Sequence, residues 1–327
     1  MERAIGSATA DGAMQTHAQG RIDASTGVRR LRALARAGAV AALVLLVAAC
    51  SSLRLGYNNA DTLLLYSLDR YFDLDDAQEE LARERVRALL AWHRSTQLPD
   101  YAALLAGAQQ RLDATPAAPL TADEVLALQG EINARVITLA RQAAPDLAQL
   151  AASLSDAQMA RFRARLADEN AKLRRERAGP RNQDPAAAAT ARAERGIERA
   201  RDWLGPLTPA QQALVRAAVQ RSPDGERRWL DERERRQQAL LALLERMRSE
   251  KAAPPAGGAL LADYFVQLVE PGDPQRRAEV RSMRETNARL IADLLNSASS
   301  AQKAALIQRL RGYAEDFTVL ASQGARS

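Results

Sequence analysis

Four predicted helix starts share one pattern, a Ser or Thr followed three residues later by Glu or Gln, and this pattern constrains the fold more than any other feature. It is the capping box that marks a helix start. The hydroxyl accepts a hydrogen bond from the third residue's backbone N–H, and the Glu or Gln side chain accepts one from the backbone N–H of the Ser or Thr. The boxes are Thr121 with Glu124, Ser155 with Gln158, Thr208 with Gln211 and Ser299 with Gln302, and Asp75 with Gln78 is a looser fifth. We predict a helix start at each.

Apolar residues recur at helical spacing behind these starts, and no segment shows the convincing two-residue alternation of a strand. Val125, Leu128 and Ile132 form one such stripe, and Leu306 and Leu310 begin another. The residue types agree, because Ala, Leu, Arg, Gln and Glu favour helices and aromatic residues make up only 4% of the chain. We therefore predict an all-α fold, a multi-helix bundle that is either compact or elongated.

Proline and glycine clusters divide the predicted helices. A linker or hinge is predicted at residues 179–190, between an N-terminal half at 57–178 and a C-terminal half at 191–327. The segment Pro254–Gly258 predicts a second break. Whether the halves are separate domains or one continuous bundle stays open. Five prolines stand at predicted first turns, where a missing N–H costs nothing: Pro99, Pro145, Pro209, Pro223 and Pro274.

The region before Cys50, the chain's only cysteine, has the pattern of a secretory signal. Arg29, Arg30, Arg32 and Arg36 precede an uncharged run from Ala37 to Ala49. This run is shorter than the roughly 20 residues that a spanning helix needs. The sequence Val47-Ala48-Ala49-Cys50 resembles a bacterial lipobox, which implies cleavage between Ala49 and Cys50 and transfer of diacylglycerol to the thiol. Residues 1–49 are then the signal region, and residues 50–56 are the lipid anchor and tether.

Two further expectations concern this region. Residues 1–27 are polar and irregular, so we expect them to precede the true translation start, with Val28 as the alternative start. Ser51 and Ser52 follow the lipid cysteine, where an Asp would mark retention in the inner membrane. The resemblance to known lipoproteins therefore implies the outer membrane, facing the periplasm, rather than the inner membrane.

The first apolar run after Cys50 carries the most distinctive residues. We interpret it as the first core helix, with a docking surface close to the membrane as the alternative. The candidate interaction residues are Tyr57, Asn58, Asn59, Asp61, Tyr66 and Tyr71. Together with Asp73, Leu74 and Gln78, the Tyr-Asn-Asn-Ala-Asp sequence resembles an uncharacterised family of proteobacterial lipoproteins, domain of unknown function 6279. The resemblance implies lipoprotein character and a helical fold, and it implies no activity.

No residues after Cys50 form a recognisable catalytic or metal-binding motif. Histidine occurs only at positions 17 and 93, so neither a His-based metal site nor a Ser-His-Asp triad is predicted, and we interpret His93 as a packing residue. Asp69, Asp73, Asp75 and Asp76 lack the spacing of a calcium loop and suit a helix N-terminus. We predict no catalytic residue, no metal and no cofactor.

The net charge of +6 is scattered among acids, so nucleic acid is not a predicted partner. The sequence predicts a non-enzymatic protein, held on the membrane by its lipid, that binds an envelope protein as an adaptor or an unfolded client. Leu154–Gln158 and Leu207–Gln211 resemble the Leu-Thr-x-x-Gln motif of small periplasmic chaperones, although any capping box has this form. The alternatives are a peptidoglycan hydrolase that uses an acidic residue and a structural spacer. The oligomeric state is not predicted.

Overall fold

The computed structural model describes residues 52–114, 118–178, 184–222, 224–250 and 253–324. The predicted signal region, Ala49 and the lipidation site Cys50 therefore lie outside the described residues, as do residues 179–183 of the predicted linker and Pro223. The chain divides into two units, residues 1–53 and residues 54–327, and the description below concerns the second.

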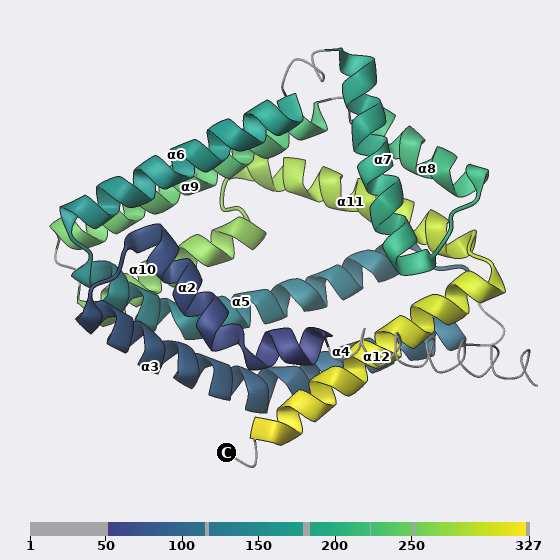
Figure 1. The fold of residues 1–327 in the computed structure, drawn as a ribbon. Coiled ribbons are helices and arrows are strands. Elements are labelled where there is room, and N and C mark those ends of the chain that lie inside the picture. Colours follow the sequence, from purple (N-terminus) through teal and green to yellow (C-terminus); the bar gives the residue numbers. More distant parts are fainter. Residues whose placement is uncertain (1–51, 115–117, 179–183, 223, 251–252, 325–327) are drawn as a thin grey trace, which may run out of the picture. The chain divides into compact units, whose positions relative to one another are not determined.

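The described residues form helices and no strand, which confirms the all-α prediction (Figure 1). The helices are α2 (Ala60–Phe72), α3 (Asp76–Trp92), the π-helical turn η1 (His93–Gln97), α4 (Leu98–Asp113), α5 (Ala122–Ser153), α6 (Asp156–Ala178), α7 (Pro185–Leu204), α8 (Pro209–Gln220), α9 (Gly225–Ser249), α10 (Pro254–Val269), α11 (Pro274–Asn296) and α12 (Ser300–Gly324). None of these helices combines the length and apolarity needed to span a membrane.

All five predicted capping boxes are present and begin α3, α5, α6, α8 and α12. In each, the backbone N–H of the Glu or Gln donates to the capping side chain over 2.9–3.2 Å. The capping residue's own N–H donates back to the Glu or Gln side chain over 2.8–3.1 Å. The capping signals in the sequence therefore place these helix starts correctly.

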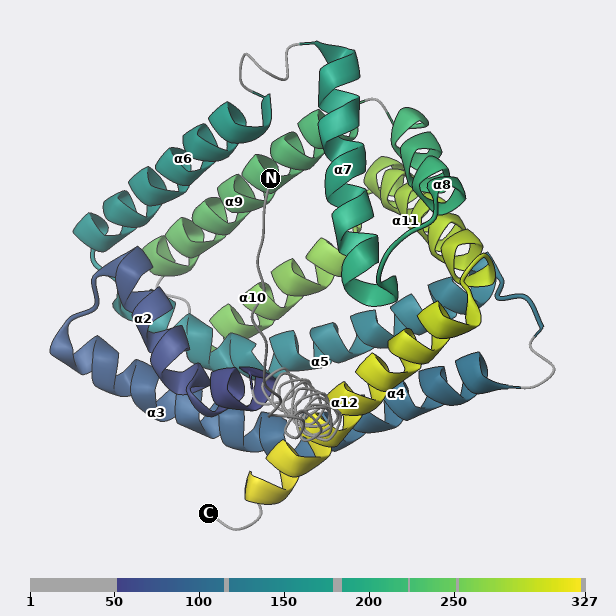
Figure 2. The same cartoon turned by 45° about the vertical axis from the view of Figure 1, so that its right-hand side comes forward.

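Two apolar cores hold the helices together. The first core contains Ala148, Phe162, Leu244 and Leu261 from α5, α6, α9 and α10, and Phe72 at the end of α2 packs against it. The second core joins α7, α8, α11 and α12, and side chains of α4 pack against it. Figure 2 shows α12 along α4 and α6 along α9. The first core thus joins helices from both predicted halves of the sequence, and the second is built from the C-terminal half with α4 of the N-terminal half packed against it.

The second predicted break is displaced by a few residues, because α9 ends at Ser249 and Pro254–Gly258 form the start of α10. Pro145 also differs from its prediction, since it lies inside α5 instead of in a first turn. The two findings have one physical cause, the close packing of α10 on α5. A Cβ added at Gly258 would lie 3.0 Å from the Cα of Pro145, so this approach requires glycine.

The second part of the predicted linker at residues 179–190 is helical. Helix α7 begins at Pro185, because the side chain of Asp184 accepts a hydrogen bond from the N–H of Ala186 over 3.0 Å and proline suits the first helical position. Residues 185–190 are therefore helical. Pro209 and Pro274 also occupy the first positions of their helices, as predicted.

Candidate functional site

The segment after the predicted lipid cysteine is held against the helices by its own polar side chains. The Tyr57 hydroxyl shares a hydrogen bond of 2.8 Å with Nδ1 of His93, and the two rings stack with centroids 5.8 Å apart. The Arg94 guanidinium lies 5.1 Å from the Tyr57 ring centroid and donates to Oδ1 of Asn58 over 3.2 Å. Tyr57 and Asn58, two of the candidate interaction residues, therefore have partners within the chain.

The partners of Tyr57 and Asn58, His93 and Arg94, lie on the π-helical turn η1. Its wider turn separates α3 from α4 and is held by the Thr96 hydroxyl, which donates to the Trp92 carbonyl over 2.7 Å. The His93 ring meets Tyr101 edge-on, with centroids 5.4 Å apart. Burial lowers the pKa of His93 below its usual 6.5, so its imidazole is neutral at pH 7. The predicted packing role of His93 agrees with these contacts.

A buried ion pair completes what we call the tether clamp, which consists of Arg54, Tyr57, Asn58, His93, Arg94 and Asp316. Asp316, on α12, is only 1% exposed, and its carboxylate accepts a hydrogen bond from Nε of Arg54. Because a buried carboxylate needs a compensating charge, this pair fixes residue 54 to the C-terminal helix. The chain just after the predicted anchor is thus attached to both η1 and α12.

The remaining candidate interaction residues fall into two groups. Tyr71 is half-buried, and its hydroxyl contacts the Glu169 carboxylate at 2.8 and 3.0 Å. Asp61 is half-buried and accepts a hydrogen bond from the N–H of Thr62. Asn59 and Tyr66 are exposed, and Tyr66 is 64% exposed. Of the six residues, only Asn58, Asn59 and Tyr66 are exposed, and Asn58 is bound by Arg94.

The glutamines of four capping boxes pair with one another, which sequence reasoning missed. Gln211 and Gln302 exchange two amide hydrogen bonds of 3.0 and 3.1 Å and form the first glutamine clasp. Gln78 and Gln158 form the second, at 3.3 and 2.6 Å. Each amide also donates to a backbone carbonyl at the end of another helix or in a connecting segment, such as Ser153 for Gln78. Each clasp therefore joins two helix starts.

A groove of about 630 Å³ lies between α6 and α9. The active site of a hydrolase would be expected in such a groove. Leu166 and Leu241 line it, and its side chains also make polar links between the helices. Arg174 pairs with Glu234 over 2.7 Å, and Asn170 donates to Gln237 over 2.5 Å. The hydrogen bond from Arg174 lowers the pKa of Glu234, so this acid stays ionised near neutral pH.

The other carboxyl groups with a shifted pKa behave in the same way. Hydrogen bonds from Arg111 and Thr121 lower the pKa of Glu124 to about 2. Burial raises the pKa of Glu232, but hydrogen bonds from Arg235 and Arg236 outweigh it and bring the value to about 2. A general acid needs the opposite shift. Within the described ranges, His, Cys, Asp and Glu do not gather in threes at a spacing that could hold a metal ion.

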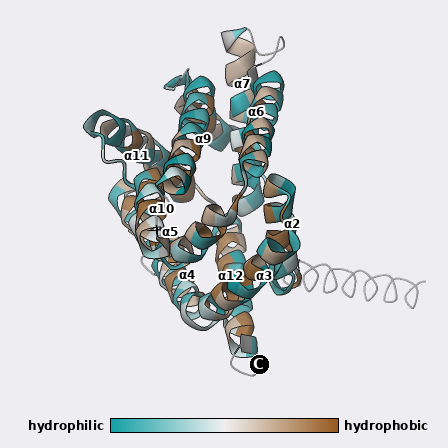
Figure 3. Ribbon diagram, turned by 90° about the vertical axis from the view of Figure 1, so that its left-hand side faces the viewer, coloured by the Kyte–Doolittle hydropathy of each residue, from teal (hydrophilic) through white to brown (hydrophobic). Residues whose placement is uncertain are grey.

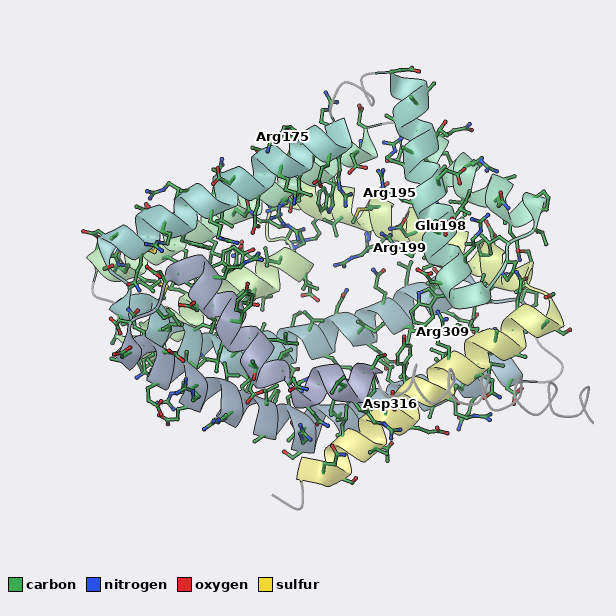
Figure 4. The ribbon with its side chains drawn as sticks, viewed as in Figure 1. Arg175, Arg195, Glu198, Arg199, Arg309 and Asp316 are labelled. Carbon is green, nitrogen blue, oxygen red and sulfur yellow. The ribbon has the colours of Figure 1, made fainter. Side chains whose placement is uncertain are left out.

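The most distinctive exposed cluster lies where α7 meets α12, and we call it the aromatic–arginine surface: Arg199, Trp203, Arg309 and Tyr313. Trp203 and Tyr313 are 41% and 36% exposed, with ring centroids 6.1 Å apart. The Arg309 guanidinium lies 5.7 Å from the Trp203 ring centroid. Figure 4 shows Arg199 on α7 and Arg309 on α12. Trp, Tyr and Arg are the residues most enriched in the binding hot spots of protein interfaces.

The arginines in and around this surface differ in whether they form an ion pair with a carboxylate. The neighbouring Arg195 pairs with Glu226 over 2.5 Å, and Arg201 pairs with Glu198 over 2.5 Å. Arg199 and Arg309 form no ion pair with any carboxylate in the part of the chain that the structure describes. The surface therefore presents two guanidinium groups beside two exposed aromatic rings, a chemistry that suits a carboxylate-bearing partner.

Comparison with protein families identifies the chain. The model described as "Family of unknown function (DUF6279)" matches residues 70–255, more than half of the 327 residues. The chain belongs to this family. The DUF6279 family predicted from the sequence is therefore confirmed, although the match begins after Tyr57–Asp61. Comparison with curated proteins and with solved structures finds no match.

The DUF6279 match covers only part of the features described above. It includes the clasp between Gln78 and Gln158 and also Trp203, whereas Arg309 and Tyr313 follow it in the sequence. These surface residues could not be predicted from the sequence, because single exposed aromatics give no periodic signal. A Trp on an otherwise polar stretch of helix, as at Trp203, is the one indication that could have drawn notice.

Proposed function

We propose that the protein is a non-enzymatic adaptor, anchored by lipid on Cys50 in the outer membrane and facing the periplasm, that binds an acidic segment of another envelope protein. The aromatic–arginine surface is the proposed binding site. The observation that carries the proposal is the exposed pair of Trp203 and Tyr313, with the Arg309 guanidinium 5.7 Å from the Trp203 ring centroid and the exposed Arg199 one helical turn before Trp203 on α7. Acidic side chains of the partner would pair with the guanidinium groups, and its apolar side chains would cover the rings.

The tether clamp supports an adaptor more than a protein on a loose stalk. Arg54 and Tyr57 follow Cys50 closely in the sequence, and both are bound to helices of the body, through Asp316 and His93. A lipid on Cys50 would therefore hold the body close to the membrane surface. An adaptor gains from such fixed placement, because the effective concentration of its partner in the same membrane rises.

A chaperone-like function is the second candidate, because Leu154–Gln158 and Leu207–Gln211 resemble a periplasmic chaperone motif. The glutamine clasps supply a structural reason for the same motif, since Gln158 and Gln211 are used inside the fold. The hydrolase alternative has less support, since the shifted acids Glu124, Glu232 and Glu234 all have a lowered pKa. The clasp and pKa observations both favour the adaptor.

The test is an affinity capture of the lipidated protein from cross-linked envelopes, with bound material identified by mass spectrometry. We expect one defined envelope protein that is retained by the wild type and lost from Arg309→Ala. Arg311→Ala is the matched control, because Arg311 is an exposed arginine on the same helix. The Cys50→Ala form tests the anchor. Capture of many unrelated unfolded proteins would favour the chaperone, and capture of glycan fragments alone would favour the hydrolase.

A further inference from the structure

Helix α2 and the turn before it expose one continuous side that no other helix covers. We call it the α2 outer face, and its members recur at helical spacing: Leu55, Asn59, Leu63, Tyr66 and Arg70, with Thr62 and Ser67 beside them. Leu55, Leu63 and Tyr66 are 67%, 56% and 64% exposed, among the most exposed large apolar residues of the described chain. In Figure 3, hydrophobic residues are visible on α2.

The opposite side of α2 accounts for its packing. Tyr71 and Phe72 pack against the first core, and α2 contacts α3 and α6. The outer face is therefore not needed to hold the helix in place. Exposure of a Leu or Tyr costs solvation energy, so three such residues on one face indicate a surface that is covered under working conditions.

The charge pattern on this face distinguishes a lipid surface from a protein. From Leu55 to Ser67 the face carries Leu, Asn, Thr, Tyr and Ser and no charged residue, and Arg70 at its end pairs with Glu169 of α6 over 3.3 Å. Of the two acids of α2, Asp61 is half-buried, whereas Asp69 is exposed at the edge of the face, three residues after Tyr66, and accepts a hydrogen bond from the N–H of Leu74 over 3.2 Å. An amphipathic helix that lies in a membrane interface has this character, with Leu and Tyr entering the headgroup region and Arg at the edge.

The short connection between Cys50 and the α2 outer face indicates that a membrane covers this face. Leu55 follows Cys50 by five residues. Five residues span at most about 18 Å, even when fully extended. A diacylglycerol group on Cys50 would thus hold a bilayer within reach of the start of this face. The α2 outer face would not have to find the bilayer by diffusion, because the lipid would already attach the protein to it.

We propose that the α2 outer face lies on the bilayer into which the Cys50 lipid inserts, with Leu55, Leu63 and Tyr66 in the interface. This inference rests on the lipid anchor of the proposed function, and it adds a second contact that orients the body. Because the tether clamp joins the start of this face to α12, contact with the lipid would fix the orientation of the helices that carry the aromatic–arginine surface. The lipid alone would allow the body to rotate.

The test uses the full-length protein in vesicles of phosphatidylethanolamine and phosphatidylglycerol that contain doxyl-labelled lipid. Leu63→Cys and Tyr66→Cys variants carry an environment-sensitive fluorophore, and acylated Cys50 does not react with it. Met283→Cys on α11 is the control, because Met283 is 57% exposed and lies on another helix. We expect several-fold stronger quenching at positions 63 and 66 than at position 283.

Two readouts separate this inference from the anchor. Mass spectrometry of the N-terminal peptide reports whether Cys50 carries lipid. Lipidated, vesicle-bound protein with equal quenching at positions 63 and 283 would overturn the inference and leave the anchor standing. A label at position 63 that escapes the doxyl lipid, together with an intermolecular disulfide formed by the unlabelled Leu63→Cys variant, would assign the face to a dimer, which also overturns the inference. A peptide without lipid would overturn both proposals.

Discussion

Replacement of Gln211 by Met gives the sharpest test of the glutamine clasps. Gln211 is 1% exposed, and its amide takes part in four hydrogen bonds. It donates to Gln302 and to the Ser297 carbonyl, and it accepts from Thr208 and Gln302. Methionine has nearly the same length and shape, so the change removes hydrogen bonds with little change in volume.

The magnitude follows from these bonds. A net intramolecular hydrogen bond contributes about 0.5–1.5 kcal/mol, and a buried polar group left without a partner costs about 1–3 kcal/mol. The Gln302 amide would keep its bonds to Pro206 and Ser299 but lose both bonds to Gln211, and the Ser297 carbonyl would lose its bond to the same amide. Water can still reach the N–H of Thr208 at the helix start. We expect Gln211→Met to lower the free energy of unfolding by about 2–4 kcal/mol.

The assay is urea unfolding of the full-length protein in detergent, followed by circular dichroism. Gln220→Met is the control, because Gln220 is an exposed residue of the same helix, and its effect should stay within about 0.5 kcal/mol. The double variant Gln211→Met with Gln302→Met should cost clearly less than the sum of the two single changes, since neither amide is then left alone. Equal effects of Gln211→Met and Gln220→Met, or additive single changes, would refute the clasp.

Three further predictions concern packing, buried charge and pH. Gly258→Ala should lower the free energy of unfolding by about 1–3 kcal/mol, because the new Cβ would lie 3.0 Å from the backbone of α5. The control is Gly107→Ala, which has open space around it and should raise the free energy of unfolding in the same urea assay. Arg54→Met should lower the unfolding free energy by about 2–4 kcal/mol, because it strands the buried Asp316 carboxylate, and Asp316→Asn in the same chain should recover part of the loss. The folded-state pKa of Glu232, about 2, lies below its ordinary 4.5, so its stabilisation is present above pH 4.5 and is lost as the pH falls toward 2. Glu232→Gln should therefore flatten the fall of the melting temperature between these pH values, and an unchanged acid profile would contradict the ion-pair argument.

The helix starts could be predicted from the sequence because a capping box is a local structure. Its two hydrogen bonds join residues three positions apart, so Thr208 and Gln211 specify their own geometry. The pairing of Gln211 with Gln302 joins residues 91 positions apart and depends on the packing of α8 against α11 and α12. One difference between the boxes was visible in the sequence. The box at Thr121 has Glu124 in place of Gln, and that residue pairs with Arg111 instead of with another box.

The errors at Pro145 and Gly258 also have a physical origin. Local rules assign proline to a first turn and a Pro-Gly cluster to a break, because each weakens an isolated helix. In the folded chain the two sites face each other, and the absence of a Cβ at Gly258 lets α10 approach α5 closely. Packing between the helices outweighs the local cost. A single sequence contains no periodic signal for such an approach.

The candidate site was predictable only in part. The Tyr57–Asp61 sequence stood out, but its spacing gave no indication that Tyr57 binds His93 or that Arg54 neutralises Asp316. These contacts join the N-terminal segment to residues on α12 and in the π-helical turn, and a π-helical turn has no clear sequence signature. The exposed pair of Trp203 and Tyr313 was equally hidden, since it forms only when α7 and α12 meet.

The most direct test of the central proposal is photo-cross-linking in cells from the aromatic–arginine surface. A photoreactive phenylalanine replaces Tyr313 in the lipidated protein, and the same residue at Met283 on α11 is the control. Our account predicts one defined envelope protein joined at position 313, absent from position 283, and lost when Arg309→Ala is added. No adduct at position 313, or the same set of adducts at both positions, would contradict it.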